Sequence, residues 1–96
     1  MTSTKCQIGV ESMFINKTED GRNNVCGIVV ARLRTAEGIS QRELADRLQR
    51  DGLDVDKNAV QRIESGQRFV TDIELLHLSR VLGAGLDTLL GSEELP

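Results

Sequence analysis

The sequence predicts an all-α domain built from five short helices. Between Val25 and Gly91, apolar residues recur at spacings of three and four, and glycines separate the periodic runs. Two segments, one beginning at Ser40 and one at Thr71, have the S/T-x-x-E pattern of a helix capping box. Together these observations place helices at about residues 25–37, 40–50, 56–65, 71–82 and 86–90.

The first two predicted helices are each followed by a glycine. Gly38 follows the first run, at a position where a left-handed glycine commonly ends a helix. The second helix opens with the capping box Ser40-Gln41-Arg42-Glu43, and Gly52 lies just beyond its end. The apolar positions of the two helices are Ile28, Val29, Ala31 and Leu33, and then Leu44, Ala45 and Leu48.

The last three predicted helices also have readable ends. Asp56 is the expected N-cap of the third helix, and Gly66 follows it. The second capping box opens the fourth helix, and Gly83 ends it. The leucines of the fourth and fifth helices are Leu75, Leu76, Leu78, Leu82, Leu86, Leu89 and Leu90. Because isolated helices of this length are marginal in water, we expect packing around one core to hold them.

The ends of the chain differ from this helical region. Residues 1–24 have little periodicity and are predicted to be an N-terminal arm or loosely ordered tail, and residues 92–96 a C-terminal tail. A short strand or docking arm built on the apolar residues between Ile8 and Ile15 stays open as an alternative. Met13 could also begin a shorter product, which intact-mass measurement of the native protein would test.

Composition excludes several classes of function. With 2% aromatic residues, the base-stacking surface of an OB-fold or RRM is not expected. The net charge is −3, so any nucleic-acid binding must rest on a local basic patch. No segment is apolar enough to span a membrane and no signal peptide is evident, so we expect a cytoplasmic protein with Cys6 and Cys26 as free thiols. No catalytic set, metal site or cofactor motif is expected, so the protein is predicted not to be an enzyme.

The third predicted helix has two distinct faces. At about 100° per residue, Ala59, Val60 and Ile63 fall on one side. The opposite side has amides, cations and a hydroxyl but no acid, and its residues are Lys57, Asn58, Gln61, Arg62 and Ser65. Amide side chains can pair with adenine in the major groove, and arginine with guanine or with phosphate. A plain solvated polar face is the alternative interpretation.

Neighbouring segments favour DNA binding over a plain solvated face. The helix that begins after Ser40 could hold a phosphate oxygen with its N-terminal amides, helped by Gln41 and Arg42. Gln67 and Arg68 follow the third helix and could reach a second phosphate. A helix in the major groove with phosphate contacts on both sides is how a helix-turn-helix protein docks.

Residues 25–91 resemble the helix-turn-helix domain of the Cro/CI (XRE) family of transcriptional regulators. The segments that carry the resemblance are 31–34 (ARLR), 38–45 (GISQRELA), 62–68 (RIESGQR), 74–75 (EL), 82–83 (LG) and 86–90 (LDTLL). The resemblance implies a compact five-helix, λ-repressor-like DNA-binding domain. It also implies a phosphate contact at Gln41, an exposed helix face at Lys57, Asn58, Gln61 and Arg62, and a backbone-facing loop at Gln67 and Arg68.

The resemblance further implies a structural ion pair between Arg34 and Glu64. Three features depart from the family pattern. The link at residues 49–56 is longer than the usual turn, which leaves the angle of the third helix open. Its aspartates Asp51, Asp54 and Asp56 lie close to the expected interface, where they would repel phosphate if they faced it. Gly85 stands where the family often has a capping serine or threonine, at a cost of a few tenths of a kcal/mol.

Two functions follow as hypotheses. The first is sequence-specific binding of a double-stranded DNA operator by a regulator, a repressor by family habit and a homodimer on two half-sites about 34 Å apart. The second is a protein-interaction module, such as an antitoxin or adaptor with a protein partner, which the acidic balance favours slightly. Neither hypothesis involves a membrane.

Overall fold

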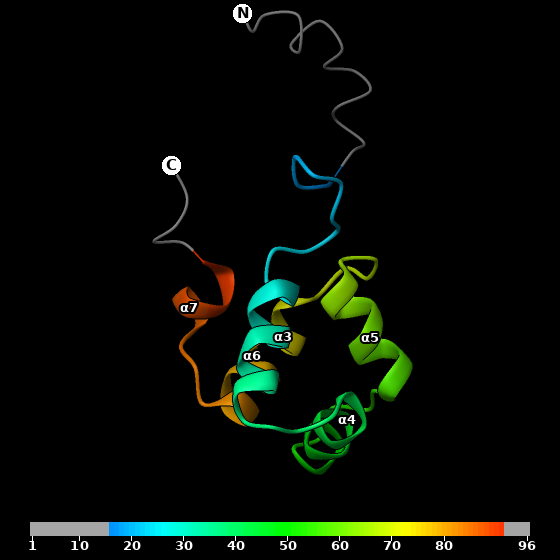
Figure 1. Ribbon diagram of the computed structural model, residues 1–96, viewed down its shortest axis with the longest axis vertical. Coiled ribbons are helices and arrows are strands. Elements are labelled where there is room, and N and C mark those ends of the chain that lie inside the picture. Colours follow the sequence, from blue (N-terminus) through cyan, green and yellow to red (C-terminus); the bar gives the residue numbers. More distant parts are fainter. Residues whose placement is uncertain (1–15, 92–96) are drawn as a thin grey trace, which may run out of the picture.

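The computed structural model describes residues 16–91, and this part of the chain is an all-helical domain with one core. In Figure 1, α4 crosses one end of the domain, α5 and α7 stand at opposite sides, and α3 and α6 lie between them. Every predicted helix is present, and each boundary agrees within two residues. The five helices are α3 (Gly27–Ala36), α4 (Gln41–Arg50), α5 (Lys57–Ser65), α6 (Asp72–Leu82) and α7 (Leu86–Leu90).

Side-chain caps define where three of the helices begin. Asp56 accepts a hydrogen bond from the Ala59 amide at 2.9 Å, as expected for an N-cap. Thr71 and Glu74 form the complete reciprocal capping box at the start of α6. The box expected at Ser40 is only half formed, because the Glu43 carboxylate bonds to arginines of its own helix instead.

The core joins all five helices, although it uses fewer of the apolar residues than expected. Val29 and Val30, rather than Ile28, are the buried apolar residues of the first part of α3. The fully buried side chains with the largest volumes are Leu44, Leu48, Ile63, Leu78, Leu89, Val30, Val60 and Cys26. Four of the apolar helix positions named from the sequence are exposed rather than buried in the core: Ile28, Leu76, Leu86 and Leu90.

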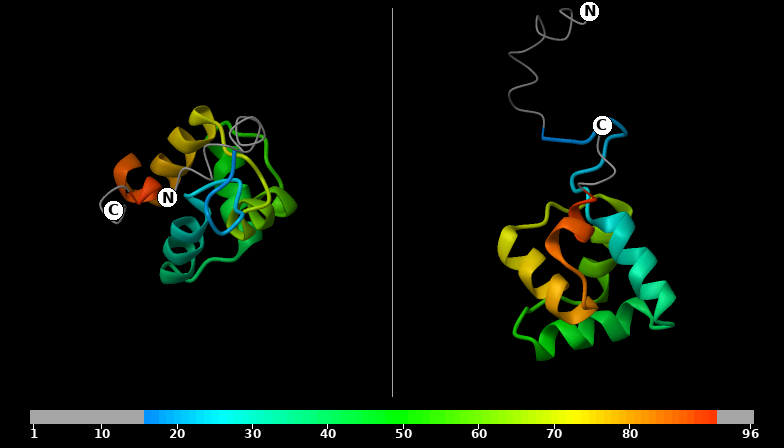
Figure 2. Two further views of the ribbon diagram at one scale, coloured as in Figure 1. Left: turned by 90° about the horizontal axis from the view of Figure 1, so that it is seen from above. Right: turned by 90° about the vertical axis from the view of Figure 1, so that its left-hand side faces the viewer.

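The long link between α4 and α5 is folded onto the domain. Val55 is buried, and Leu53 packs against the core from the link. The Leu53 amide bonds to the Leu48 carbonyl at 2.9 Å, and the Gln49 side-chain amide donates to the Val55 carbonyl at 2.6 Å. These contacts close the link, so α4 and α5 pack directly on each other despite its length. Figure 2 shows α4 lying across the lower ends of the other helices.

Residues 22–24, which precede the expected start of the domain at residue 25, are hydrogen-bonded to the end of α5 and to the segment after it. The hypotheses on residues 1–15, including the shorter product from Met13, and on the tail at 92–96 lie outside the described residues. Among residues 16–91, no helix is long and apolar enough to cross a membrane.

Candidate nucleic-acid interface

The outer face of α5 is a continuous polar surface. Its inner face is buried through Ala59, Val60 and Ile63. The exposed residues are Lys57, Asn58, Gln61, Arg62 and Ser65. The side chains of Lys57, Asn58, Gln61 and Arg62 make no hydrogen bond to another residue within 16–91, so their polar groups remain available to a ligand. Ser65 differs, because its hydroxyl donates to the Arg62 carbonyl at 3.3 Å.

The one carboxylate on α5 is turned away from this surface. The Glu64 side chain is 8% exposed and accepts two hydrogen bonds from Arg34 of α3, from Nε at 2.6 Å and from Nη2 at 3.0 Å. The hydrogen bond with Glu64 raises the pKa of the Arg34 guanidinium above its ordinary value. The expected ion pair therefore forms, and it compensates the negative charge of the one acid on α5.

Gln41, at the start of α4, also contacts this ion pair. Its side-chain Nε2 donates to the Glu64 Oε1 at 2.9 Å. The amide therefore links the first turn of α4 to α5. Arg42, the next residue, is exposed and makes no side-chain hydrogen bond within residues 16–91.

The α5–α6 loop, residues 66–71, contains the last two predicted site residues. Gln67 is exposed. Arg68 is half-buried and pairs with Glu74 of α6, with 2.7 Å between Nη2 and Oε2. The Arg68 Nε is buried without a hydrogen-bond partner in the described part of the chain. Arg68 is therefore held against the domain by a carboxylate that the sequence interpretation did not assign to it.

The aspartates near α5 are largely occupied by contacts within the domain. Asp51 accepts a hydrogen bond from His77 at 2.7 Å and a second from Arg80 at 3.2 Å, both from α6. The bond with His77, aided by Arg80, lowers the pKa of the Asp51 carboxyl. Asp56 caps α5, and Asp54 is exposed. The negative charge of the link is thus partly neutralised within the domain.

Sequence interpretation missed the contribution of Arg22, Asn23 and Asn24 to this site. All three donate hydrogen bonds to main-chain carbonyls at the end of α5 or in the α5–α6 loop. A local signal existed, because Asn24 lies three residues before Gly27 and its side chain accepts from the Gly27 amide at 2.8 Å. The bonds to α5 span about forty residues of sequence and had no such signal.

Comparison with known protein families and solved structures also indicates a helix-turn-helix domain. The model of a helix-turn-helix domain family matches residues 25–90. The chain belongs to that family. It is a DNA-binding transcriptional regulator of the XRE, Cro/CI type.

A solved structure extends the comparison. This helix-turn-helix regulator is similar to the restriction-modification controller protein C.AhdI from Aeromonas hydrophila, with 33% sequence identity and a TM-score of 0.58. The match covers 67% of this chain and 86% of that protein. A comparison with curated proteins gives no match.

Proposed function

We propose that this regulator binds a specific double-stranded DNA sequence with α5 in the major groove. The observation that carries the proposal is the outer face of α5, where amides and cations are exposed while the only acid of the helix is paired with Arg34. Asn58, Gln61 and Arg62 contact base edges, since amide and guanidinium groups form bidentate pairs with adenine and guanine. Lys57 lies beside them on the first turn of α5 and contacts a base or a phosphate.

Residues on either side of α5 bind the DNA backbone in this proposal. Gln41 and Arg42 bind one phosphate at the start of α4, where the helix N-terminus also favours an anion. Ser65, Gln67 and Arg68 bind a second phosphate at the end of α5. Gln41 already bonds to Glu64, so it orients the phosphate-facing end of α4 relative to α5.

The experiment selects bound duplexes from random DNA with the wild type, Arg62→Ala and Gln41→Ala. Arg62→Ala is expected to change the selected sequence, and Gln41→Ala to weaken all sequences alike. Arg32→Ala, an exposed change on α3, serves as the control for loss of one positive charge. No enrichment by the wild type at low salt would remove the proposal, and an equal loss on all sequences for Arg62→Ala would reduce Arg62 to a phosphate contact.

We further infer that the regulator acts as a homodimer. Four exposed apolar side chains on the adjacent helices α6 and α7 support this inference: Ile73, Leu76, Leu86 and Leu90. Two copies would bind half-sites about 34 Å apart. Sedimentation of the wild type and of Leu76→Glu tests it, with a dimer expected for the wild type and a monomer for the variant. A monomeric wild type on two-fold DNA would contradict it.

The similarity to C.AhdI supports control of a restriction-modification system as the regulatory context. We propose repression through operator occupancy as the mode of action. A reporter placed behind the selected sequence is expected to lose expression when the regulator is supplied, and Arg62→Ala should restore it. A rise in expression would identify an activator instead.

A further inference from the structure

The segment before α3 supplies the donors that cover the C-terminal end of α5. The Asn24 side chain donates to the Ile63 carbonyl at 3.0 Å, and Arg22 Nη2 donates to the Glu64 carbonyl at 2.8 Å. The last carbonyls of a helix have no partner within the helix, and they carry the negative end of its dipole. Arg22 therefore places a positive charge on that negative end.

The same segment also holds the α5–α6 loop. The Asn23 amide donates to the Gly66 carbonyl at 2.7 Å, and the Asn23 side chain donates to the Gln67 carbonyl at 2.8 Å. The Asn24 side chain adds a bond to the Arg68 carbonyl at 2.7 Å. The three residues of the segment thus donate hydrogen bonds to five carbonyls in all, two at the end of α5 and three in the α5–α6 loop.

Two glycines allow this close approach. A Cβ atom on Gly27 would overlap the Ile63 carbonyl oxygen. A Cβ atom on Gly66 would lie 2.8 Å from Cζ of Arg22 and 2.9 Å from its Cγ. In Figure 1, the chain before α3 and the loop after α5 accordingly meet at the same end of the domain. The segment is therefore packed against the loop as well as bonded to it.

We propose that Arg22, Asn23 and Asn24 form a positioning clasp that fixes the end of α5 and the α5–α6 loop for contact with DNA phosphates. This inference rests on the proposed function, because Gln67 and Arg68 are the backbone contacts on that loop. The clasp acts in two ways. It orders the loop before DNA binds, and its donors engage carbonyl oxygens that would otherwise face and repel a phosphate.

The clasp predicts a loss of affinity that does not depend on DNA sequence. Arg22→Ala removes a charged hydrogen bond and is expected to weaken binding about 5- to 30-fold on every duplex. The selected base sequence should stay that of the wild type, because the outer face of α5 is unchanged. Asn23→Ala, a half-buried and milder change, should weaken binding in the same uniform manner.

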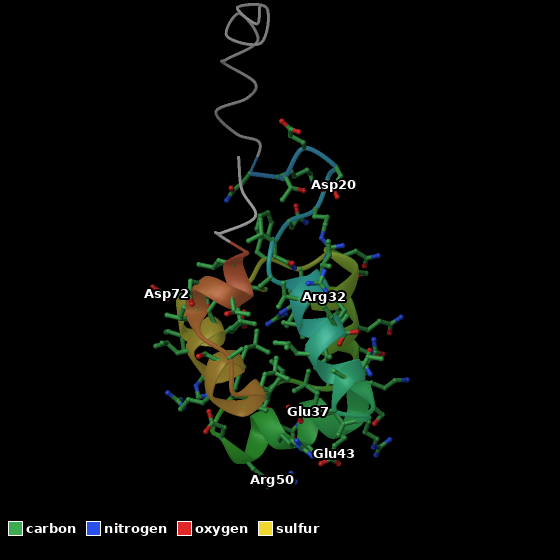
Figure 3. All side chains as sticks on the ribbon, turned by 60° about the vertical axis from the view of Figure 1, so that its left-hand side comes forward. Asp20, Arg32, Glu37, Glu43, Arg50 and Asp72 are labelled. Carbon is green, nitrogen blue, oxygen red and sulfur yellow. The ribbon has the colours of Figure 1, made fainter. Side chains whose placement is uncertain are left out.

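Two further variants separate positioning from loss of charge or of fold. Arg22→Lys keeps the positive charge and an ammonium group that can donate to the Glu64 carbonyl, so it should recover most of the affinity. Arg32→Ala removes an exposed charge of α3 that makes no side-chain hydrogen bond within residues 16–91, and it should stay within about twofold of the wild type. Figure 3 labels Arg32 on α3. Thermal unfolding followed by circular dichroism identifies a temperature at which all variants are folded, and DNA binding is measured at that temperature.

Amide hydrogen exchange in the absence of DNA provides the second measurement. Faster exchange at residues 66–70 in Arg22→Ala and Asn23→Ala, with unchanged exchange in α4, is expected if the clasp orders the loop. Wild-type affinity and wild-type exchange in both variants would overturn the clasp. If the wild type binds no DNA, the proposed function fails and the phosphate part of the inference fails with it, while exchange still decides whether the loop is held.

Discussion

The Arg34 guanidinium and the Glu64 carboxylate are joined by two hydrogen bonds, of 2.6 Å and 3.0 Å, between α3 and α5. Arg34 also donates to the Ile39 carbonyl at 2.8 Å, and Glu64 also accepts from Gln41 at 2.9 Å. The network thus connects α3, the turn before α4, the start of α4 and α5. It fixes α4 and α5 against α3.

Breaking this pair is expected to be costly. Glu64→Ala leaves the mostly buried Arg34 without its anion and should lower the free energy of unfolding by about 3–5 kcal/mol. Arg47→Ala, which breaks exposed pairs with Glu37 and Glu43, is the matched control and should cost about 1 kcal/mol or less. Urea unfolding measures both. Similar costs for the two variants would show that the Arg34 pair adds no more than a surface pair.

Gly66 and Gly38 differ in what surrounds them, and this difference predicts unequal costs of substitution. Both have positive φ, +85° and +73°, but only Gly66 has neighbours within reach of a Cβ atom. Gly38→Ala should cost about 1–2 kcal/mol for the left-handed backbone alone. Gly66→Ala should cost about 1–3 kcal/mol more, because the new methyl group crowds Arg22.

A double mutant isolates the crowding. In an Arg22→Ala background, the cost of Gly66→Ala should fall to that of Gly38→Ala, as measured by urea unfolding. An unchanged cost would place the strain in the backbone rather than in the contact with Arg22.

The pairing of Asp51 with His77 predicts how stability depends on pH. The bond from His77 lowers the pKa of Asp51 in the folded state below its unfolded value of about 3.9. A lowered folded pKa stabilises the protein above the unfolded pKa, and this contribution disappears as the pH falls through the folded value. The wild type should therefore lose stability below about pH 4, and Asp51→Asn should lose less over the same interval.

The control for this effect is another aspartate of the same region. Asp46 is exposed on α4 and makes no side-chain hydrogen bond within residues 16–91. Asp46→Asn should follow the wild-type pH profile in urea unfolding measured at several pH values. Identical profiles for all three proteins would exclude Asp51 as a source of acid sensitivity.

The helices could be predicted from local signals, while the site could be predicted only in part. Asp56, Thr71 and the glycines after the helices act within a few residues, so their effects are visible in sequence. The outer face of α5 follows from helical period alone. Which leucines are buried does not, because Leu76 and Leu90 are exposed by the way that α6 and α7 pack, and packing is a property of the whole fold.

Contacts that leave no signal in the local sequence pattern account for what was missed. Arg68 was expected to reach a phosphate, and its pairing with Glu74, six residues further along the chain, depends on how the α5–α6 loop turns. Arg22 and Asn24 donate to main-chain carbonyls. Because every residue has such a carbonyl, the sequence does not indicate which residues accept these bonds. The resemblance to the Cro/CI family supplied the Arg34–Glu64 pair, which residue patterns alone did not indicate.

Cys26 is predicted to be unreactive until the domain unfolds. It is 1% exposed, and burial raises the pKa of its thiol to about 11. At pH 8 only about one thiol in a thousand would be ionised even if a reagent could reach it, and the thiolate is the reactive form. In a Cys6→Ser background, which leaves a single thiol, a thiol reagent should label the folded protein far more slowly than the urea-unfolded protein. Mass spectrometry during the reaction measures the two rates. Adding Arg22→Ala should speed the labelling of the folded protein, because this change loosens the segment that precedes Cys26. Labelling of the folded Cys6→Ser protein as fast as its unfolded chain would contradict the burial of this cysteine in the core.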